Sequence, residues 1–507
     1  RRMAAAARPI PVKRSNTAHM PMARRRTARA SAQSATTGAS HDAPRAIVCG
    51  AGPIGAVTAA LLAQRGFRVL CLERREDPAT TKSLPRTYPM AINARGLEVL
   101  EKAALDGALA GSFAHGGFGR VNADGSLTSI AFGGDKNSRR SGKLTDWLSL
   151  TSGLHRTVRE NHADDVELRF GVAVCADSVD TDARTVTPRD STGKELPAES
   201  YDLLIGADGA SSAVREAVFG PDAVRTLFSS KGSVYRVARG IDKQLLPDSV
   251  RELMVNNGAG NLVRFGSMDA PASAVLYPTP KSGDTNSDFE VNAMFIAKRE
   301  LMGAPEKYAA AIADIPVLPP KIAKLAAETN RTGDPPSNFG SVRWLDKFGS
   351  DRVALVGDAA HAVTSTLGHG ATLGMGSALA LAEALDSTDG DLDEVVAAYS
   401  AARAPQAHWL QRIEVFNAVA NAGKNYRRPL LGTLALVVRS ANFLGSLVLS
   451  RVSTRFAPYV VSLGDSRVGY GVMAGSVVLN AAVGVAIVSI AGAVTVAAGL
   501  AAARLVS

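Results

Sequence analysis

The sequence contains few of the residues from which proteins build thiol-based metal centres. Its 507 residues include three cysteines, Cys49, Cys71 and Cys175. They form no Cys-x-x-Cys pair and no other metal-ligand spacing, so no metal site is expected from them. Cys49 and Cys71 lie in apolar runs, where cysteine usually packs as a small hydrophobic side chain. We therefore predict no metal, and we name no catalytic side chain.

Acidic residues are missing from the first 41 positions. This segment holds nine basic residues, is rich in Ala, Ser and Thr, and is followed by the first acid, Asp42. Such a composition is typical of a mitochondrial or chloroplast transit peptide, and the alternative is a disordered basic tail. The Ser, Thr and Ala content after Arg29 favours the chloroplast. We expect a protein of an organelle membrane, with the chloroplast favoured and the mitochondrion as the alternative.

The net charge of +10 comes almost entirely from that first segment. The rest of the chain has 48 basic and 47 acidic residues, which leaves it close to neutral. A nucleic-acid-binding protein needs a basic face on its folded body. We therefore expect no nucleic-acid partner.

Charged residues are also missing from 468–503, a run of 36 positions near the C-terminus. About 20 apolar residues are enough to cross a bilayer as a helix. We predict a membrane anchor here, which crosses once after a glycine-rich lead-in or turns back near Asn480. A second apolar stretch, Pro429–Ser450, contains Arg439 and is expected to form a packed or interfacial helix.

Between these ends the chain changes its pattern twice. Residues 46–73 read as strand, glycine turn, helix and strand, which is the opening of a Rossmann-type domain. Residues 232–300 contain short apolar runs separated by Gly, Asn, Asp and Pro, as in a mostly antiparallel sheet. Residues 352–386 return to strand, glycine-rich turn and helix. The fold class expected is therefore α/β, with a sheet domain inserted into a discontinuous Rossmann-type domain of the β-β-α variant.

The glycine turn is the first of three motifs. Its sequence is Gly-Ala-Gly-Pro-Ile-Gly over residues 50–55. In a dinucleotide-binding turn, the first glycine permits the tight turn, the second lets the backbone approach a pyrophosphate, and the third lets helix and strand pack closely. The helix N-terminus attracts the phosphates. Glu73, at the end of the second expected strand, is placed to bind ribose hydroxyls. The alternative for the whole motif is an ordinary glycine turn without a ligand.

Two further motifs place an acid where a buried strand ends in a turn. The second motif is the run 201–209, with Asp208 near its end, and the third is Gly357-Asp358 with His361 and the later Gly368-His369-Gly370. Ligands in such folds bind at the carboxyl ends of strands. The alternative for each aspartate is a helix cap. His361 is expected to be structural, whereas contact of His369 with a ligand is left open.

Together and in this order, the three motifs resemble those of the class A flavoprotein monooxygenases, which share the p-hydroxybenzoate hydroxylase fold. The resemblance covers about 45–460 and implies FAD as cofactor. It implies that the first motif binds the ADP half, that Asp208 lies near the pyrophosphate, and that Asp358 binds the ribityl chain. Gly368 and Gly370 would face the flavin ring. The helix that starts near Thr372 would direct its N–H groups at the pyrimidine edge.

Within the family, the chain most resembles the kynurenine 3-monooxygenases, on residues 357–362, on Arg86 with 91–96, and on 466–470 before an apolar tail. It departs from the family pattern at Ser365, where a proline is usual, and at His369, Thr372 and Thr151, where Gln, Asn and Arg are usual. The cofactor-binding residues implied are Gly50, Gly52, Pro53, Ile54, Gly55, Glu73, Arg74, Arg86, Asp208, Gly357, Asp358, Gly368, Gly370 and Ala371.

The function that the resemblance implies is an FAD-dependent monooxygenase, which uses NADPH or NADH and O2 on an aromatic or lipophilic small molecule. The alternatives are an FAD-dependent reductase of a membrane lipid or quinone, and a flavin-binding membrane protein without oxygenase activity. The expected organisation is 1–41 transit peptide, 42–225 and 346–400 FAD-binding domain, 226–345 sheet domain for the substrate, 401–467 C-terminal helices and 468–503 membrane anchor.

Overall fold

The computed structural model describes residues 43–80, 87–131, 142–230, 232–267, 270–281, 288–332, 336–422, 428–453, 456–457, 462–463, 465 and 468–506. The predicted transit peptide, residues 1–41, lies outside the described residues. The chain from Pro44 onward forms one compact unit.

A six-stranded sheet carries the three motifs. Its strand order is β22-β23-β13-β1-β2-β7, and its pairings are parallel except at β22–β23. The central strand β1 pairs Ala46 with Leu203 on one side and with Val69 on the other. Strands buried on both faces read as continuous apolar runs, as these do. The strands are β1 (Arg45–Cys49), β2 (Arg68–Glu73), β7 (Val166–Phe170), β13 (Leu203–Gly206), β22 (Gly349–Ser350) and β23 (Val353–Leu355).

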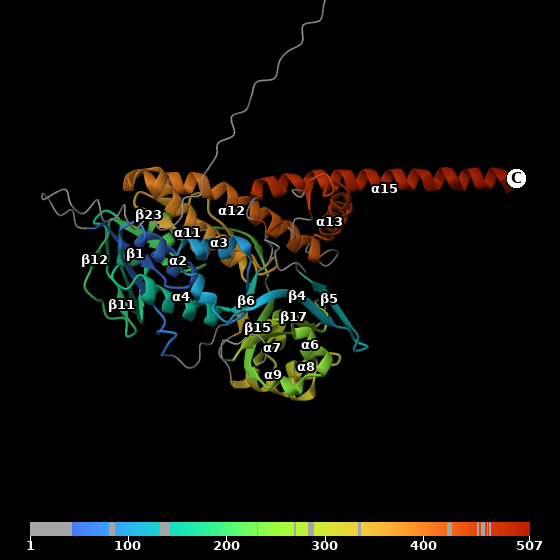
Figure 1. Cartoon of the computed structure of the whole chain (residues 1–507), viewed down its shortest axis with the longest axis horizontal. Helices are drawn as coiled ribbons and strands as arrows, with labels where there is room; N and C mark the ends of the chain where they lie inside the picture. Colours follow the sequence, from blue (N-terminus) through green and yellow to red (C-terminus); the bar gives the residue numbers. More distant parts are fainter. Residues whose placement is uncertain are drawn as a thin grey trace, which may run out of the picture. The chain divides into compact units, whose positions relative to one another are not determined.

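Helices pack around this sheet and share its hydrophobic core (Figure 1). Helix α2 is apolar all round, because it lies between the sheet, α4 and α11 and is buried along nearly its whole length. The helices of this part are α2 (Pro53–Ala63), α3 (Ala94–Lys102), α4 (Trp147–Asn161), α5 (Ala213–Phe219), α10 (Asp358–His361), α11 (Gly370–Ser387) and α12 (Leu392–Ala422).

A second core lies around a larger, ten-stranded sheet. The described pairings of this sheet are antiparallel except for β17–β4. Helices α8 and α9 pack against its strands β18 and β15. The elements are β3 (Pro89–Ile92), β4 (Phe113–Val121), β5 (Leu127–Ala131), β6 (Lys143–Asp146), β15 (Ser233–Ile241), α6 (Asp248–Met254), β16 (Val255–Asn256), β17 (Ala259–Phe265), β18 (Ala272–Pro280), β19 (Phe289–Lys298), α7 (Arg299–Met302), α8 (Pro305–Ala313), α9 (Pro320–Thr332) and β20 (Ser337–Asn338).

The α/β fold class is confirmed, but the sequence interpretation missed part of the larger sheet. Strands β3 to β6 precede residue 150 and complete that sheet, although 42–225 was assigned to the FAD-binding part. These strands pair mainly with one another, and β4 joins them to the distant strand β17, so no local pattern shows which sheet they belong to. Smaller ladders use β8 (Val172–Ala173), β9 (Val179–Asp180), β10 (Thr185–Val186), β11 (Arg189–Asp190), β12 (Glu199–Ser200), β14 (Arg225–Ser229) and β21 (Ser341–Trp344).

Two apolar helices close the chain. Helix α13 (Pro429–Leu449) packs against α12 and against α15 (Tyr470–Val506), as Figure 1 shows at the red end of the colour scale. Helix α13 and the segment Tyr470–Ser489 of α15 are long and apolar enough to cross a membrane. Helix α15 runs without interruption through Asn480, so a turn at that residue, one of the two arrangements predicted, is wrong.

Candidate functional site

The glycine turn has the close contacts that its motif requires. Gly50 has φ +98°, a conformation that side-chain-bearing residues rarely adopt, and its N–H donates to Leu72 O at 2.8 Å. A Cβ on Gly55 would lie 1.8 Å from the carbonyl oxygen of Gly50. A Cβ on Gly52, in contrast, would have no atom within 4 Å. The backbone at Gly52 therefore borders open space, as a phosphate-binding turn needs.

Helix α2 presents free N–H groups at this turn. Gly52 is its N-cap and makes no side-chain capping bond, and Pro53 opens the first turn. The next residue, Ile54, contacts Gly357 and Gly374, where added Cβ atoms would lie 3.1 Å and 2.7 Å from its side chain. The first and third motifs are therefore in direct contact, and the helix dipole points to the open space beside Gly52.

Glu73 holds the glycine turn itself. Its carboxylate accepts hydrogen bonds from the N–H groups of Ala51 and Arg75, both at 3.0 Å. The side chain is buried at the end of β2, and Arg74 beside it is exposed. Arg86 lies outside the described residues. In the structure the Glu73 carboxylate therefore shapes the glycine turn. Its contact with ribose hydroxyls stays a prediction.

Asp208 acts partly as the helix cap that was its alternative role. One carboxylate oxygen, Oδ2, accepts from the N–H groups of Ala213 and Val214 at 2.7 and 3.3 Å. The other oxygen, Oδ1, is buried without a hydrogen-bond partner among the described residues. Burial raises the pKa of Asp208. Arg215 links this motif to the third by donating to Ala359 O at 2.8 Å.

Asp358 is the most accessible polar group of the third motif. Its side chain is exposed, whereas Ala359, Ala360 and His361 are buried. The surrounding protein raises the pKa of Asp358 by desolvation, against the attraction of the Arg343 guanidinium. An accessible carboxylate can accept hydrogen bonds from the hydroxyls of a bound molecule.

His361 is structural, since its Nε2 lies 2.6 Å from the Ser377 hydroxyl and its ring contacts Phe348. Burial lowers the pKa of His361 to about 3. Thr372 does not cap α11, because His369 occupies the N-cap position. The Thr372 hydroxyl is instead buried without a hydrogen-bond partner among the described residues. With Asp208 Oδ1, it provides a second polar atom that a bound cofactor could satisfy.

Residues 362–370, which we call the flavin loop, join α10 to α11. Side chains from the C-terminal helices hold this loop at two points. The Glu414 carboxylate of α12 accepts from the hydroxyls of Thr364 and Thr366 and from backbone N–H groups of the loop. The His369 ring lies 2.6 Å from the Tyr470 hydroxyl of α15. Gly368 and Gly370 flank His369, and Ala371 follows in the first turn of α11.

Several residues at the site were not found from the sequence. His155 of α4 lies with Nε2 2.6 Å from Ala51 O, one helical turn after Thr151, which replaces the family's arginine. Glu414 and Tyr470 contact the flavin loop from positions with no motif of their own. Only the i, i+4 spacing of Thr151 and His155 gave a signal, because it places both side chains on one face of α4.

Three rings form an aromatic wall beside the third motif. The centroids of Tyr88 and Tyr235 are 6.5 Å apart, and those of Tyr235 and Phe339 are 5.0 Å apart. Burial raises the pKa of Tyr88, and the negative charge of Asp358 raises it further. The ring planes are inclined by 77° and 54°, so the three side chains form an aromatic cluster with edge-to-face contacts.

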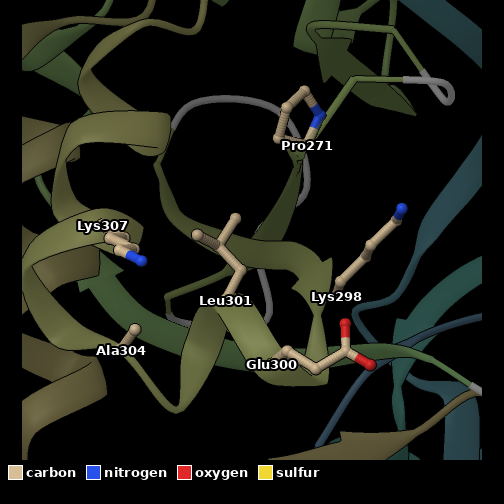
Figure 2. A pocket seen from close by; sticks show the side chains of 6 residues that line it. All are labelled: Pro271, Lys298, Glu300, Leu301, Ala304 and Lys307. Atoms are coloured by element: carbon tan, nitrogen blue, oxygen red, sulfur yellow. The ribbon is translucent and has the colours of Figure 1, made fainter.

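A separate pocket of about 400 Å³ opens in the part of the chain around β19 and α7 (Figure 2). None of the predicted cofactor-binding residues lines it. Its lining residues are Pro271, Lys298, Glu300, Leu301, Ala304 and Lys307.

The nucleotide turn, the accessible aspartate and the unsatisfied polar atoms around them define a flavin-binding site of the Rossmann type. Residues 44–412 match the family model described as FAD binding domain. The chain belongs to this family.

Named relatives are similar over most of the chain. Violacein synthase of Chromobacterium violaceum is 27% identical over 386 residues, which are 72% of this chain and 83% of the relative. A kynurenine 3-monooxygenase of Stenotrophomonas maltophilia is 27% identical over 391 residues, 73% and 78% of the two chains. The structure of 2-methyl-3-hydroxypyridine-5-carboxylic acid oxygenase superposes with a TM-score of 0.56 at 19% identity, over 78% of this chain and 96% of that one.

These findings confirm the predicted resemblance to FAD-dependent monooxygenases, including the kynurenine 3-monooxygenases. The chain is an FAD-dependent oxidoreductase of the monooxygenase type, with FAD as cofactor and NAD(P)H as electron donor.

Proposed function

We propose that the chain oxygenates an aromatic small molecule while attached to a membrane. The observation that supports this substrate class is the aromatic wall of Tyr88, Tyr235 and Phe339. Aromatic rings pair favourably with a flat aromatic ligand, by about 0.5–1.5 kcal/mol for each pair beyond the area buried. Similar proteins carry names that include kynurenine and a hydroxypyridine carboxylic acid, and both compounds are aromatic.

The protein's own part in the reaction is to bind, orient and keep out water. Bound FAD supplies the electron transfer and the oxygen chemistry. The turn at Gly52 and the N-terminus of α2 would hold the pyrophosphate, and Asp358 would accept hydrogen bonds from the ribityl hydroxyls. The free N–H groups at the start of α11 would stabilise negative charge on the ring of the reduced cofactor.

Substrate-dependent oxidation of NAD(P)H tests this function. In an anaerobic titration of the full chain in detergent, NADPH should bleach the flavin absorbance, and air should restore it. An aromatic panel with ¹⁸O2 should then give one labelled oxygen in the product. Bleaching without incorporation into any panel member would contradict oxygenation and favour the reductase alternative.

The aromatic wall offers a matched pair of variants for this assay. Tyr235→Ala should raise the KM for the substrate roughly tenfold, because a ring pair is lost, and should leave FAD affinity unchanged. The control is Phe118→Ala, since Phe118 is an exposed aromatic on β4 of the same sheet. Equal KM values for both variants and the wild type would exclude the wall from the substrate site.

The membrane part of the proposal comes from α13 and α15, which bury small and polar residues and expose large apolar ones. A Cβ on Gly445 would lie 1.8 Å from Asn480 O, and one on Gly484 would lie 1.9 Å from Ala441 O, so the backbones are in close contact. Such small-residue contacts are typical of helices paired in membranes. The outward residues include Leu430, Leu434 and Val478, at 87%, 58% and 71% exposure. A lipid bilayer is the environment that covers such a surface.

A charged residue placed on the outward face of α15 tests whether that face contacts lipid or water. Val478→Asp should cost little in water, but about 3 kcal/mol if the helix centre lies in a bilayer. We therefore expect the wild type to stay in membranes after alkaline carbonate extraction and the variant to be released. Ser476→Ala, on the inner face of the same helix, is the control, since Ser476 is buried. Release of the wild type would refute membrane insertion.

A further inference from the structure

The end of the flavin loop, Gly368–Gly370, carries little that could fix its own position. Gly368 and Gly370 have no side chains, and Gly368 has φ +61° with open space where a Cβ would lie. Ser365, earlier in the loop, has an exposed side chain. The backbone that starts α11 is therefore held by His369, whose side chain is buried.

The hydrogen bonds around His369 determine its tautomer. Asn93 caps α3 by accepting from the N–H groups of Arg95 and Gly96 through its Oδ1. Its Nδ2 must then be the donor in the 3.1 Å contact with Nδ1 of His369. The proton of the neutral ring lies on Nε2, which donates to the Tyr470 hydroxyl at 2.6 Å. Burial lowers the pKa of His369 to about 3, so the ring is neutral.

Tyr470 is itself held firmly. Its side chain is buried, and the Arg95 guanidinium lies 4.8 Å from its ring centroid. Arg95 also donates to the carbonyl groups of Leu463, Asp465 and Val468, in the segment that leads into α15. Helix α3 thus fixes both His369 and the first residue of α15.

We propose that Tyr470 is a positioning residue for the flavin, which acts through His369. It would fix the position of the Gly368–Gly370 backbone. The free N–H groups at the start of α11 would be fixed with it. This inference rests on the proposed placement of the flavin ring against that backbone. Because Tyr470 is also the first residue of the apolar helix α15, the His369–Tyr470 hydrogen bond joins the segment proposed to enter the membrane to the cofactor site.

A double-mutant cycle tests this coupling in the full chain in detergent. The variants are Tyr470→Phe, His369→Leu and the double variant, and the readouts are the dissociation constant of FAD from the apoprotein and the visible spectrum of bound FAD. Tyr308→Phe is the matched control, because Tyr308 is buried on α8 and its hydroxyl has no hydrogen-bond partner among the described residues.

We expect Tyr470→Phe to weaken FAD binding about fivefold, the effect of one ordinary buried hydrogen bond, and to shift the flavin absorption bands. Tyr308→Phe should change neither readout. If Tyr470 acts through His369, the double variant should bind FAD no more weakly than His369→Leu alone. Rescue by His369→Gln, whose amide can still bridge Asn93 and Tyr470, would support the same conclusion.

Two results would overturn the inference. In the first, Tyr470→Phe binds FAD with wild-type affinity and an unchanged spectrum. In the second, the two single effects add fully in the double variant, which would show that Tyr470 acts independently of His369. Both readouts are independent of substrate turnover, so failure of the coupling is distinguishable from failure of the proposed oxygenation. A wild type unable to take up FAD would overturn the flavin assignment as well.

Discussion

Two turns at the predicted FAD site are held in place in different ways. The glycine turn, residues 50–55, is fixed by close backbone contacts of its own glycines and by Glu73 at the end of the next strand. The flavin loop, residues 362–370, is fixed by side chains of Glu414 and Tyr470, which come much later in the chain.

The difference shows which parts of a site tolerate change. A turn fixed by backbone contact needs glycine at set positions, because a Cβ on Gly50 or Gly55 would meet a backbone carbonyl group that cannot move away. A loop fixed by side chains can exchange its own residues if a distant partner replaces the lost restraint. The departures that the sequence resemblance predicts at Ser365 and His369 fall in the second kind of turn, where Glu414 and Tyr470 supply such restraints.

The largest expected effect comes from breaking the glycine turn. Gly55→Ala places a Cβ 1.8 Å from the Gly50 carbonyl oxygen, so α2 and β1 must separate. We expect a loss of at least about 3 kcal/mol of folding stability, at the upper end for overpacking, and no FAD uptake. Thermal unfolding of the apoprotein and FAD titration measure the two effects. An unchanged melting temperature would show that backbone contact does not fix this turn.

A neighbouring substitution in the same turn should separate cofactor binding from folding. Gly52 has φ −63°, which alanine adopts readily, and no atom lies within 4 Å of an added Cβ. Gly52→Ala should therefore leave the melting temperature of the apoprotein unchanged. FAD affinity should fall roughly a hundredfold, because the methyl group enters the space that the pyrophosphate needs. Wild-type FAD affinity in this variant would mean that the cofactor does not approach Gly52.

The same distinction explains how much of the fold could be predicted. The βαβ opening was clear because strand, turn and helix follow one another directly along the chain. The mostly antiparallel sheet was also visible from its short apolar runs. Its strands β3 to β6 were not assigned to it. They join the sheet where β4 pairs with β17, which is distant in the chain, and local sequence patterns do not predict such a pairing.

The candidate site divides in the same way. Gly50, Gly52 and Gly55 were identifiable from spacing and have the contacts that the motif predicts. Glu414 was not, since a glutamate in a long helix normally lies on a solvated face, and only the tertiary structure buries it against the loop. His369 was open between two roles, and its partner Tyr470 lies 101 residues away.

The smallest expected effect is a pH dependence that Glu414 gives to the flavin loop. Desolvation raises the pKa of Glu414 to about 7 from 4.5, although hydrogen bonds from Thr364 and Thr366 oppose the shift. The folded protein therefore holds this proton more tightly than the unfolded chain does. The resulting stability is fully present below pH 4.5 and is lost as the pH rises through 7, by about 1.4 kcal/mol for each pKa unit.

Glu414→Gln mimics the protonated carboxyl group at every pH. At pH 5 the variant and the wild type should have similar unfolding free energies. At pH 8 the variant should be more stable, by on the order of 2–3 kcal/mol, because it does not bury a charge. Denaturant unfolding at both pH values measures the difference, and Glu394→Gln, an exposed position on the same helix, is the control. If the variant and the wild type had equal unfolding free energies at pH 8, Glu414 would be well solvated. The side-chain restraint of the flavin loop would then depend on Tyr470 and His369.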